Sequence, residues 1–220
     1  MDGQYLYVNK ENKTSDQAMD DFIAPFREEL AKEMDVVLIQ NETKLVKGRP
    51  NSNMGIWIAD LLQNFCDSKQ LNVDFTVQNQ GGLRKNNVGI GNMTVGNIFE
   101  IMPFENMLVI MEGDGNLVQT FCDHIAASGG WPVSEALSFE IQNDKATNIM
   151  IKGQSLDLNQ KYRFAIPDYI AKGGSDCSFF KERSFQDTGR LIRDIIIKDT
   201  EKRGKSGEAL NIQNQERIRG

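Results

Sequence analysis

The residues of this chain best suited to bind a ligand are two glycines and an arginine in residues 77–84. Gly81 and Gly82 lack Cβ atoms, so their backbone N–H groups can approach a bound group closely, and positive φ is accessible there. Two residues later, Arg84 offers a planar guanidinium that can hold a phosphate or carboxylate through paired hydrogen bonds. On their own, these residues fit a binding loop and a simple glycine turn with a solvated arginine equally well.

A basic connection precedes this loop in the chain. Residues 41–50 carry three basic side chains, among them Arg49, and the apolar spacing that follows predicts a helix over residues 54–67. The alternating residues 73–78 then predict a strand that leads into the glycines. This order of basic loop, helix, strand and glycine loop puts cations and a helix N-terminus where an anion can bind.

Two aromatic residues stand beside loops of a similar kind. Tyr169 follows a strand predicted over residues 162–166, and a second pair of glycines then precedes Asp176. A proline fixes the backbone just before Phe104, so this ring either projects from a loop or, as is commoner for Phe, packs in the core. Both aromatic positions are therefore candidates for a binding surface.

The composition excludes several classes of function. The 220 residues carry a net charge of −6 and no basic field, which argues against non-specific nucleic-acid binding. The fractions of hydrophobic (40%) and charged (25%) residues are those of a globular protein, and no apolar run is long enough to predict a membrane span. The sequence begins without the basic and apolar segments of a signal peptide.

The chain is poor in metal ligands. His124 is its single histidine and falls in an apolar helical pattern, whereas zinc and two-metal hydrolase centres use several histidines with Asp or Glu ligands. The cysteines Cys66, Cys122 and Cys177 are far apart and odd in number, so we expect buried free thiols rather than a disulfide framework. We therefore expect no metal, no cofactor and no catalytic residue in this chain itself.

Helix and strand patterns alternate along the whole chain. We expect one α/β domain of the α+β type over residues 15–200, with mixed β-sheets flanked by helices, and an N-terminal arm at 1–14. A C-terminal tail at 201–220 is expected to start with a solvated basic segment and to end in a short strand or a frayed end. The helix over 54–67 is expected to begin at Asn51 or Asn53. The other predicted elements are helices at 15–34, 94–99, 114–127 and 188–198, strands at 36–39 and 107–111, and a hairpin of 136–141 with 147–151.

Four short motifs, taken in their order and spacing, resemble a known family. They are Asn53-Met54-Gly55, Asn79-Gln80-Gly81-Gly82-Leu83-Arg84, Met102-Pro103-Phe104-Glu105-Asn106 and Asp168-Tyr169-Ile170-Ala171-Lys172-Gly173-Gly174. Each is weak alone, but together they resemble the C-terminal, substrate-binding domain of the 5′-nucleotidase family, which includes UDP-sugar hydrolases and cyclic-nucleotide phosphodiesterases. The similarity covers roughly residues 15–200.

The resemblance implies a division of labour between two domains. In that family an N-terminal metallophosphatase domain holds two metal ions and hydrolyses the substrate that the C-terminal domain grips. None of the histidine motifs of the catalytic domain occurs in this chain. The chain is thus expected to recognise a nucleotide or nucleoside for a phosphoric ester hydrolase without being catalytic alone, with a divalent metal pair in a separate or deleted metallophosphatase domain.

The motifs also carry over roles for individual residues. Asn79 is expected to form a hydrogen bond with the base, and the backbone of Gly81 and Gly82 to line the pocket. Arg84 is expected to pair with the phosphate, and the rings of Phe104 and Tyr169 to sandwich the base. Two positions depart from the family pattern. Where the family has a second arginine, this chain has a glycine next to Arg49, so the resemblance implies a shifted or weakened phosphate contact. The family's ribose-binding aspartate is replaced by serine, so Asp176 reaches the sugar only if the loop shifts by one residue.

Other functions remain open at this stage. The chain could be a stand-alone, non-catalytic nucleoside- or nucleotide-binding protein, or a domain cut from a longer enzyme; independent catalysis is the least favoured alternative. Most members of the family are exported, so the resemblance implies a periplasmic or secreted location. The sequence does not distinguish a nucleotide from a sugar nucleotide as the ligand.

Overall fold

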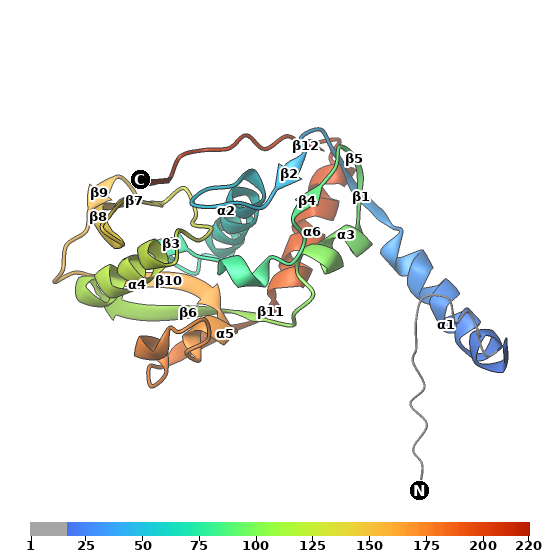
Figure 1. Ribbon diagram of the computed structural model, residues 1–220, viewed down its shortest axis with the longest axis horizontal. Helices are drawn as coiled ribbons and strands as arrows, with labels where there is room; N and C mark the ends of the chain where they lie inside the picture. Colours follow the sequence, from blue (N-terminus) through green and yellow to red (C-terminus); the bar gives the residue numbers. More distant parts are fainter. Residues whose placement is uncertain (1–16) are drawn as a thin grey trace, which may run out of the picture.

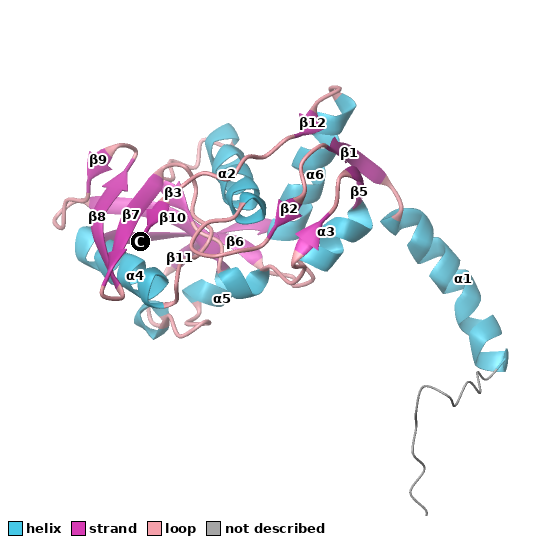
Figure 2. Cartoon of the chain, turned by 45° about the horizontal axis from the view of Figure 1, so that its top comes forward, coloured by secondary structure: helices cyan, strands magenta, loops and turns pink. Residues whose placement is uncertain are grey.

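A four-stranded sheet in the order β11-β6-β10-β3 lies at the centre of the computed structural model, which describes residues 17–220 (Figures 1 and 2). Strand β6 (Met107–Asp114) pairs antiparallel with both β10 (Lys161–Pro167) and β11 (Phe185–Leu191). Strand β3 (Phe75–Thr76) adds to β10 in parallel. The expected N-terminal arm, at 1–14, lies outside the described residues.

Both faces of this sheet are buried, and each faces a separate hydrophobic core. Along β6, Val109 and Met111 contribute to one core, whereas Leu108 and Ile110 contribute to the other. Successive side chains of a strand point to opposite faces, so a strand between two cores needs a continuous apolar run. This explains the unbroken apolar sequence over 107–111, which predicts the strand correctly.

The first core lies between the central sheet, a helix and a second sheet. Phe121 of α4 (Gly115–Ala127) packs against Phe164 of β10 with ring centroids 5.9 Å apart. The second sheet has the order β13-β7-β8-β9, and its central hairpin matches the expected one. The strands of this sheet are β7 (Leu137–Gln142), β8 (Lys145–Ile151), β9 (Gln154–Ser155) and β13 (Ile218–Arg219).

The second core is built on helix α2 (Asn53–Ser68), whose buried face matches the predicted apolar spacing. The helix begins at Asn53, one of the two expected starts, but its N-cap is Ser52, which accepts a hydrogen bond from the Gly55 N–H, so the expected capping by an asparagine was wrong. Two helices, α3 (Val95–Ile101) and α6 (Ile192–Lys205), lie around α2. A three-stranded sheet adds β12 (Ala209–Leu210), β1 (Val37–Asn41) and β5 (Gly91–Thr94) in that order, and β2 (Leu45–Val46) pairs with β4 (Asn87–Val88).

Helix α1 (Gln17–Met34) projects away from the rest of the chain (Figures 1 and 2). The expected amphipathic helix is present, and among residues 17–220 nothing covers Phe22, Phe26 and Leu30 on its apolar face, which are 55–67% exposed. No helix among residues 17–220 is long and apolar enough to cross a membrane.

The C-terminal region differs from the sequence prediction. Residues 188–191 belong to β11, so α6 begins four residues later than predicted and continues to Lys205, through the basic segment that was expected to be solvated. The chain then forms β12 and β13, which pair in parallel with β1 and β7. The end of the chain thus pairs with a strand of each hydrophobic core, β1 and β7.

The fold class is the expected mixture of small sheets and helices. The three cysteines are free and buried, as expected. Burial raises the pKa of Cys66 and Cys177 to about 12 and that of Cys122 further still, so their thiols are protonated and unreactive at neutral pH.

Candidate functional site

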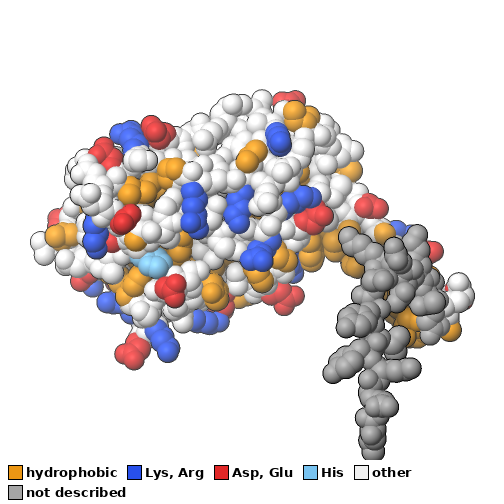
Figure 3. Space-filling model, viewed as in Figure 1, with side chains coloured by type: hydrophobic (Ala, Val, Ile, Leu, Met, Phe, Trp, Pro, Cys, Tyr) orange, Lys and Arg blue, Asp and Glu red, His pale blue; other side chains and the backbone are white. Residues whose placement is uncertain are grey.

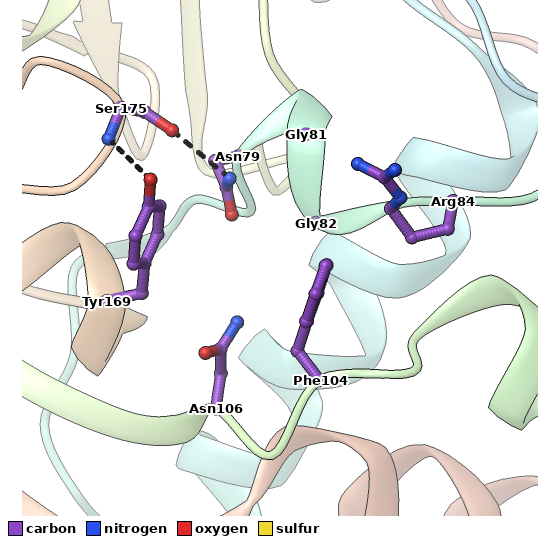
Figure 4. A pocket seen from close by; sticks show the side chains of 8 residues that line it. All are labelled: Asn79, Gly81, Gly82, Arg84, Phe104, Asn106, Tyr169 and Ser175. Atoms are coloured by element: carbon purple, nitrogen blue, oxygen red, sulfur yellow. Dashed lines mark hydrogen bonds between the residues drawn. The ribbon is translucent and has the colours of Figure 1, made fainter. Parts of the chain in front are cut away.

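Three loops enclose a cavity of about 310 Å³, a volume typical of small-ligand sites (Figure 4). One loop follows β3, the second precedes β6, and the third follows the short helix α5 (Asp168–Ala171). The residues lining the cavity are Asn79, Gly81, Gly82, Arg84, Phe104, Asn106, Tyr169 and Ser175.

The glycine loop forms a single 3₁₀ turn, η1 (Gln80–Gly82). Neither glycine of this turn has positive φ, contrary to the expected use of glycine, and close packing explains Gly82 instead. A Cβ on Gly82 would lie 2.2 Å from Nε2 of the fully buried Gln78. That amide also donates to Oδ1 of Asn79 at 3.0 Å, so Gln78 supports the loop from below and orients Asn79 toward the cavity.

The loop between α3 and β6 carries Phe104 and Asn106. Its backbone is held by α6, because Arg193 donates to the Pro103 carbonyl at 3.0 Å and the Ile192 N–H donates to the Asn106 carbonyl at 2.9 Å. Phe104 is 45% exposed, so it projects from the loop rather than packing in the core. An exposed ring fixed at the rim of a cavity is available to stack on a flat ligand.

Tyr169 occupies the opposite side of the cavity (Figure 4). Its hydroxyl accepts a hydrogen bond from the Ser175 N–H at 3.2 Å, and the Ser175 hydroxyl accepts one from Asn79 at 3.4 Å. Its ring packs on Gly174, where a Cβ would lie 2.5 Å from the ring atoms. The preceding Asp168 accepts a hydrogen bond from the Met107 N–H at 3.0 Å, which ties α5 to the strand that follows the Phe104 loop.

The single histidine packs behind the side of the cavity that Tyr169 and Ser175 form. Nε2 of His124 lies 2.9 Å from the Ser175 carbonyl oxygen, and its ring packs edge-on against Trp131 and Phe179. An apolar helical pattern predicts a packed or partly exposed imidazole, and the His124 ring is packed and half-buried. Within residues 17–220, no group of three or more His, Cys, Asp or Glu side chains is arranged to hold a metal ion.

Three cations lie close together at the Arg84 end of the cavity. Repulsion by Arg84 and Arg49 adds to desolvation in lowering the pKa of Lys47, whose ammonium donates to the Leu83 carbonyl at 2.6 Å. None of the ion pairs found in the described part of the chain involves these three side chains. Figure 3 shows several Lys and Arg side chains gathered near the middle of one face. Three cations close together, as at the Arg84 end of the cavity, favour binding of an anion.

Six of the eight residues expected in a binding site line this one cavity. Arg49 and Asp176 do not: Arg49 lies beside Gly129, and Asp176 is exposed with Ser175 in the lining instead. Asn106 and Ser175 also line the cavity but were not among the residues expected from the sequence. Asn106 stood at the end of the Phe104 motif, and Ser175 stood at the position of the family's aspartate, so both signals were present in the sequence.

The fold is that of an α/β domain with a cavity whose side walls are aromatic and one end of which is cationic. The family model described as "5′-nucleotidase, C-terminal domain" matches residues 33–182. The chain therefore belongs to the 5′-nucleotidase C-terminal domain family.

Relatives support this assignment over most of the chain. A 5′-nucleotidase of Vibrio parahaemolyticus is 31% identical over 184 residues, which are 79% of this chain and 32% of the relative. Protein UshA of Escherichia coli is 25% identical over 167 residues, which are 72% of this chain and 29% of UshA. The chain thus spans about a third of the length of these relatives.

Solved structures share the fold. The 5′-nucleotidase precursor of Thermus thermophilus superposes with a TM-score of 0.79 at 22% identity, covering 93% of this chain and 43% of that one. The NAD nucleotidase of Haemophilus influenzae gives a TM-score of 0.69 at 18% identity, covering 93% of this chain and 41% of that one. At these identities the similarity concerns the fold alone.

Proposed function

We propose that this chain is the nucleotide-recognition domain of a 5′-nucleotidase-type phosphohydrolase. The base stacks between Phe104 and Tyr169, and the phosphate lies at Arg84. The observation that carries the proposal is the arrangement of two exposed rings on opposite sides of a cavity that ends in cations, for which residues 17–220 supply no ion-pair partner. A nucleotide combines a flat aromatic base with an anionic group, and few other small molecules match both features.

The polar atoms between the rings suit the edge of a base and a sugar. The amides of Asn79 and Asn106 and the hydroxyl of Ser175 each offer both a donor and an acceptor, and all three residues line the cavity. No carboxylate lines it, so an anionic ligand meets no repulsion there. The pocket residues therefore fit a neutral nucleoside part joined to an anionic phosphate part.

Hydrolysis is assigned to a second domain, a metallophosphatase, which supplies a divalent metal pair. Two observations support this assignment. The matched relatives are about three times as long as the aligned region, and helix α1 presents an apolar face that the described residues leave uncovered. A second domain packed on that face would bury the exposed side chains of Phe22, Phe26 and Leu30. A periplasmic or secreted location stays an expectation from the family resemblance.

Calorimetry with AMP, adenosine and UDP-glucose tests recognition on the purified chain. We expect AMP to bind more tightly than adenosine, because only AMP brings an anion to the cations. Mixing the chain with a metallophosphatase domain and a divalent metal tests the enzymatic role through release of phosphate. Absence of binding to all three ligands would refute recognition. Binding without a complex or any change in rate would favour the alternative of a stand-alone binding protein.

Gly174→Ala is expected to weaken adenosine binding about as much as loss of the Tyr169 ring. The added methyl group would lie 2.5 Å from atoms of the Tyr169 ring, so the ring must move away from its position beside the cavity. Because the Tyr169 side chain is 48% exposed, the loss of folding free energy should be small. Adenosine titration and thermal unfolding measure the two effects. Gly89→Ala is the matched control, because nothing lies within 4 Å of its Cβ position. Unchanged affinity in Gly174→Ala would contradict the role of Tyr169.

Phosphate binding is expected to weaken as the pH rises through the lowered pKa of Lys47. The ammonium form attracts the phosphate, and desolvation together with Arg84 and Arg49 makes this form easier to deprotonate than an ordinary lysine. Between the lowered pKa and the usual value of 10.5, AMP binding should take up protons, because the phosphate raises the pKa again. Calorimetry in two buffers of different ionisation enthalpy measures this uptake. Lys47→Met should abolish it, and equal uptake in the variant would contradict the assignment.

The same pKa shift predicts the effect on stability in the absence of ligand. In the folded chain Lys47 holds its proton less tightly than in the unfolded chain, so the unfolded state binds more protons across that alkaline interval. The free energy of unfolding therefore rises with pH through this window as far as Lys47 alone is concerned.

A further inference from the structure

We propose that the C-terminal tail, residues 211–220, positions the cation-bearing loop 47–50, with Arg217 anchoring the tail and Asn51 linking it to the loop. This inference rests on the proposed function, because it concerns the phosphate end of the same pocket. The tail lies beyond the residues matched by the family model, which end at 182. Arg217 is thus a positioning residue rather than a ligand-contacting one.

The tail bonds directly to the residue that ends the loop. The N–H groups of Arg217 and Ile218 both donate to Oδ1 of Asn51, at 3.1 and 3.0 Å. The amide of Asn51 donates back to the Ile218 carbonyl at 2.6 Å. Asn51 follows Arg49 and Pro50 in the chain, so these three hydrogen bonds determine where the loop ends. In Figure 1 the tail runs from β12 past α2 to the C-terminus.

Arg217 fixes the tail itself. Its side chain is 5% exposed, and its two terminal nitrogens each bond a different oxygen of Asp60 on α2 at 2.7 Å. The guanidinium also donates to the Val133 carbonyl at 2.8 Å and to Gln215 at 2.7 Å. The Asp60 side chain is 31% exposed, so the pair is partly buried. A partly buried, bidentate ion pair with further hydrogen bonds holds one geometry better than a fully exposed pair does.

The opposite end of the loop is held by the pocket. Gln80 of the glycine turn donates to the Gly48 carbonyl at 3.0 Å, and the Lys47 N–H donates to the Asn86 carbonyl at 2.8 Å. The turn at Gly130, with a φ of +99°, packs so closely on Pro50 that a Cβ would lie 2.7 Å from its Cα. The loop therefore spans from the pocket to the tail.

Electrostatic repulsion explains why the loop needs this support. Lys47 and Arg49 belong to the loop, and Arg84 faces them without any carboxylate pairing with the three in the described residues. Like charges held close together favour any movement that separates them. With both ends tied, the loop keeps its cations together, ready for an anion.

The test compares AMP and adenosine affinities in Arg217→Gln, with Arg219→Gln as the matched control. Arg219 lies on the same tail, but its side chain is 64% exposed and its nearest carboxylate is 3.9 Å away. We expect Arg217→Gln to weaken AMP binding about 2–30-fold and to leave adenosine binding unchanged. The control should change neither. A parallel fall in both affinities, or no fall in either, would show that the tail has a merely structural role.

Two further measurements keep the test decisive. Asn51→Ala removes the link to the loop but keeps the Arg217–Asp60 pair, so it should give the same selective loss even if Arg217→Gln unfolds. Hydrogen exchange needs no ligand, and the amides of residues 47–49 should exchange faster in either variant while those of 169–175 do not. Unchanged exchange at 47–49 would overturn the inference, whereas faster exchange without any nucleotide binding by the native chain would refute only the proposed function.

Discussion

Arg84→Ala is expected to weaken AMP binding by ~10–150-fold and to leave adenosine binding nearly unchanged. A hydrogen bond to a charged group contributes about 1.5–3 kcal/mol, and each 1.4 kcal/mol changes the affinity about tenfold. Arg84 lines the cavity and has no ion-pair partner among the described residues, so its loss breaks no ion pair of the fold. Calorimetric titration of both ligands measures the difference.

Arg190→Ala is the matched control for this experiment. Arg190 is an exposed arginine of β11 that does not line the cavity, so its removal changes the net charge equally without touching the pocket. A distant charge acts on AMP only through a screened field. If both variants weaken AMP binding to the same extent, the effect is one of overall charge, and Arg84 is not the phosphate-binding residue.

The second large effect is expected from removing the aromatic walls. Phe104→Ala and Tyr169→Ala should each weaken adenosine binding by ~5–150-fold, since stacking on an aromatic side chain contributes about 1–3 kcal/mol per base. The two rings are 45% and 48% exposed, so their truncation leaves no large internal cavity and the domain should stay folded. Titration with adenosine isolates the stacking contribution, because this ligand carries no phosphate.

The double variant gives the sharper result, since binding of the base should be abolished when both rings are missing. Phe185→Ala is the matched control, being a partly exposed phenylalanine of β11 outside the cavity lining. The Arg84 guanidinium lies 5.7 Å from the centre of the Phe104 ring, so the effects of Arg84→Ala and Phe104→Ala should not add. Adenosine binding that survives loss of both rings would place the base elsewhere.

Local patterns in the sequence predicted most elements correctly, because those elements obey local rules. Helix α3 begins at Val95 after the N-cap Thr94, whose hydroxyl and the Asn97 side chain cap each other's backbone N–H groups. The hairpin turn at Asn143 and Asp144 has positive φ at both residues, a conformation that Asn and Asp tolerate. The continuous apolar run of β6 identified a strand buried on both faces.

Predictions failed where long-range contacts outweighed local preference. Residues 188–191 lie in an amphipathic pattern, yet they form the end of β11 on the open edge of β6. The pairing is irregular after Asp187, and it resumes where Leu191 lies opposite Met107. Asn51 is a good helix cap by composition, but its side chain bonds the C-terminal tail, which leaves the cap to Ser52. Neither outcome depends on residues nearby in the sequence.

The sequence alone determined which residues could recognise a ligand and, through the single histidine, that this chain offers no histidine-rich metal centre. It determined the family as well, because four motifs kept their order. Only the tertiary structure decided that the glycine loop, Phe104 and Tyr169 enclose one cavity, that Ser175 rather than Asp176 lines it, and that Arg217 reaches back to the basic loop. These facts depend on contacts between segments far apart in the chain, whose geometry follows from packing around two cores and not from local residue preferences.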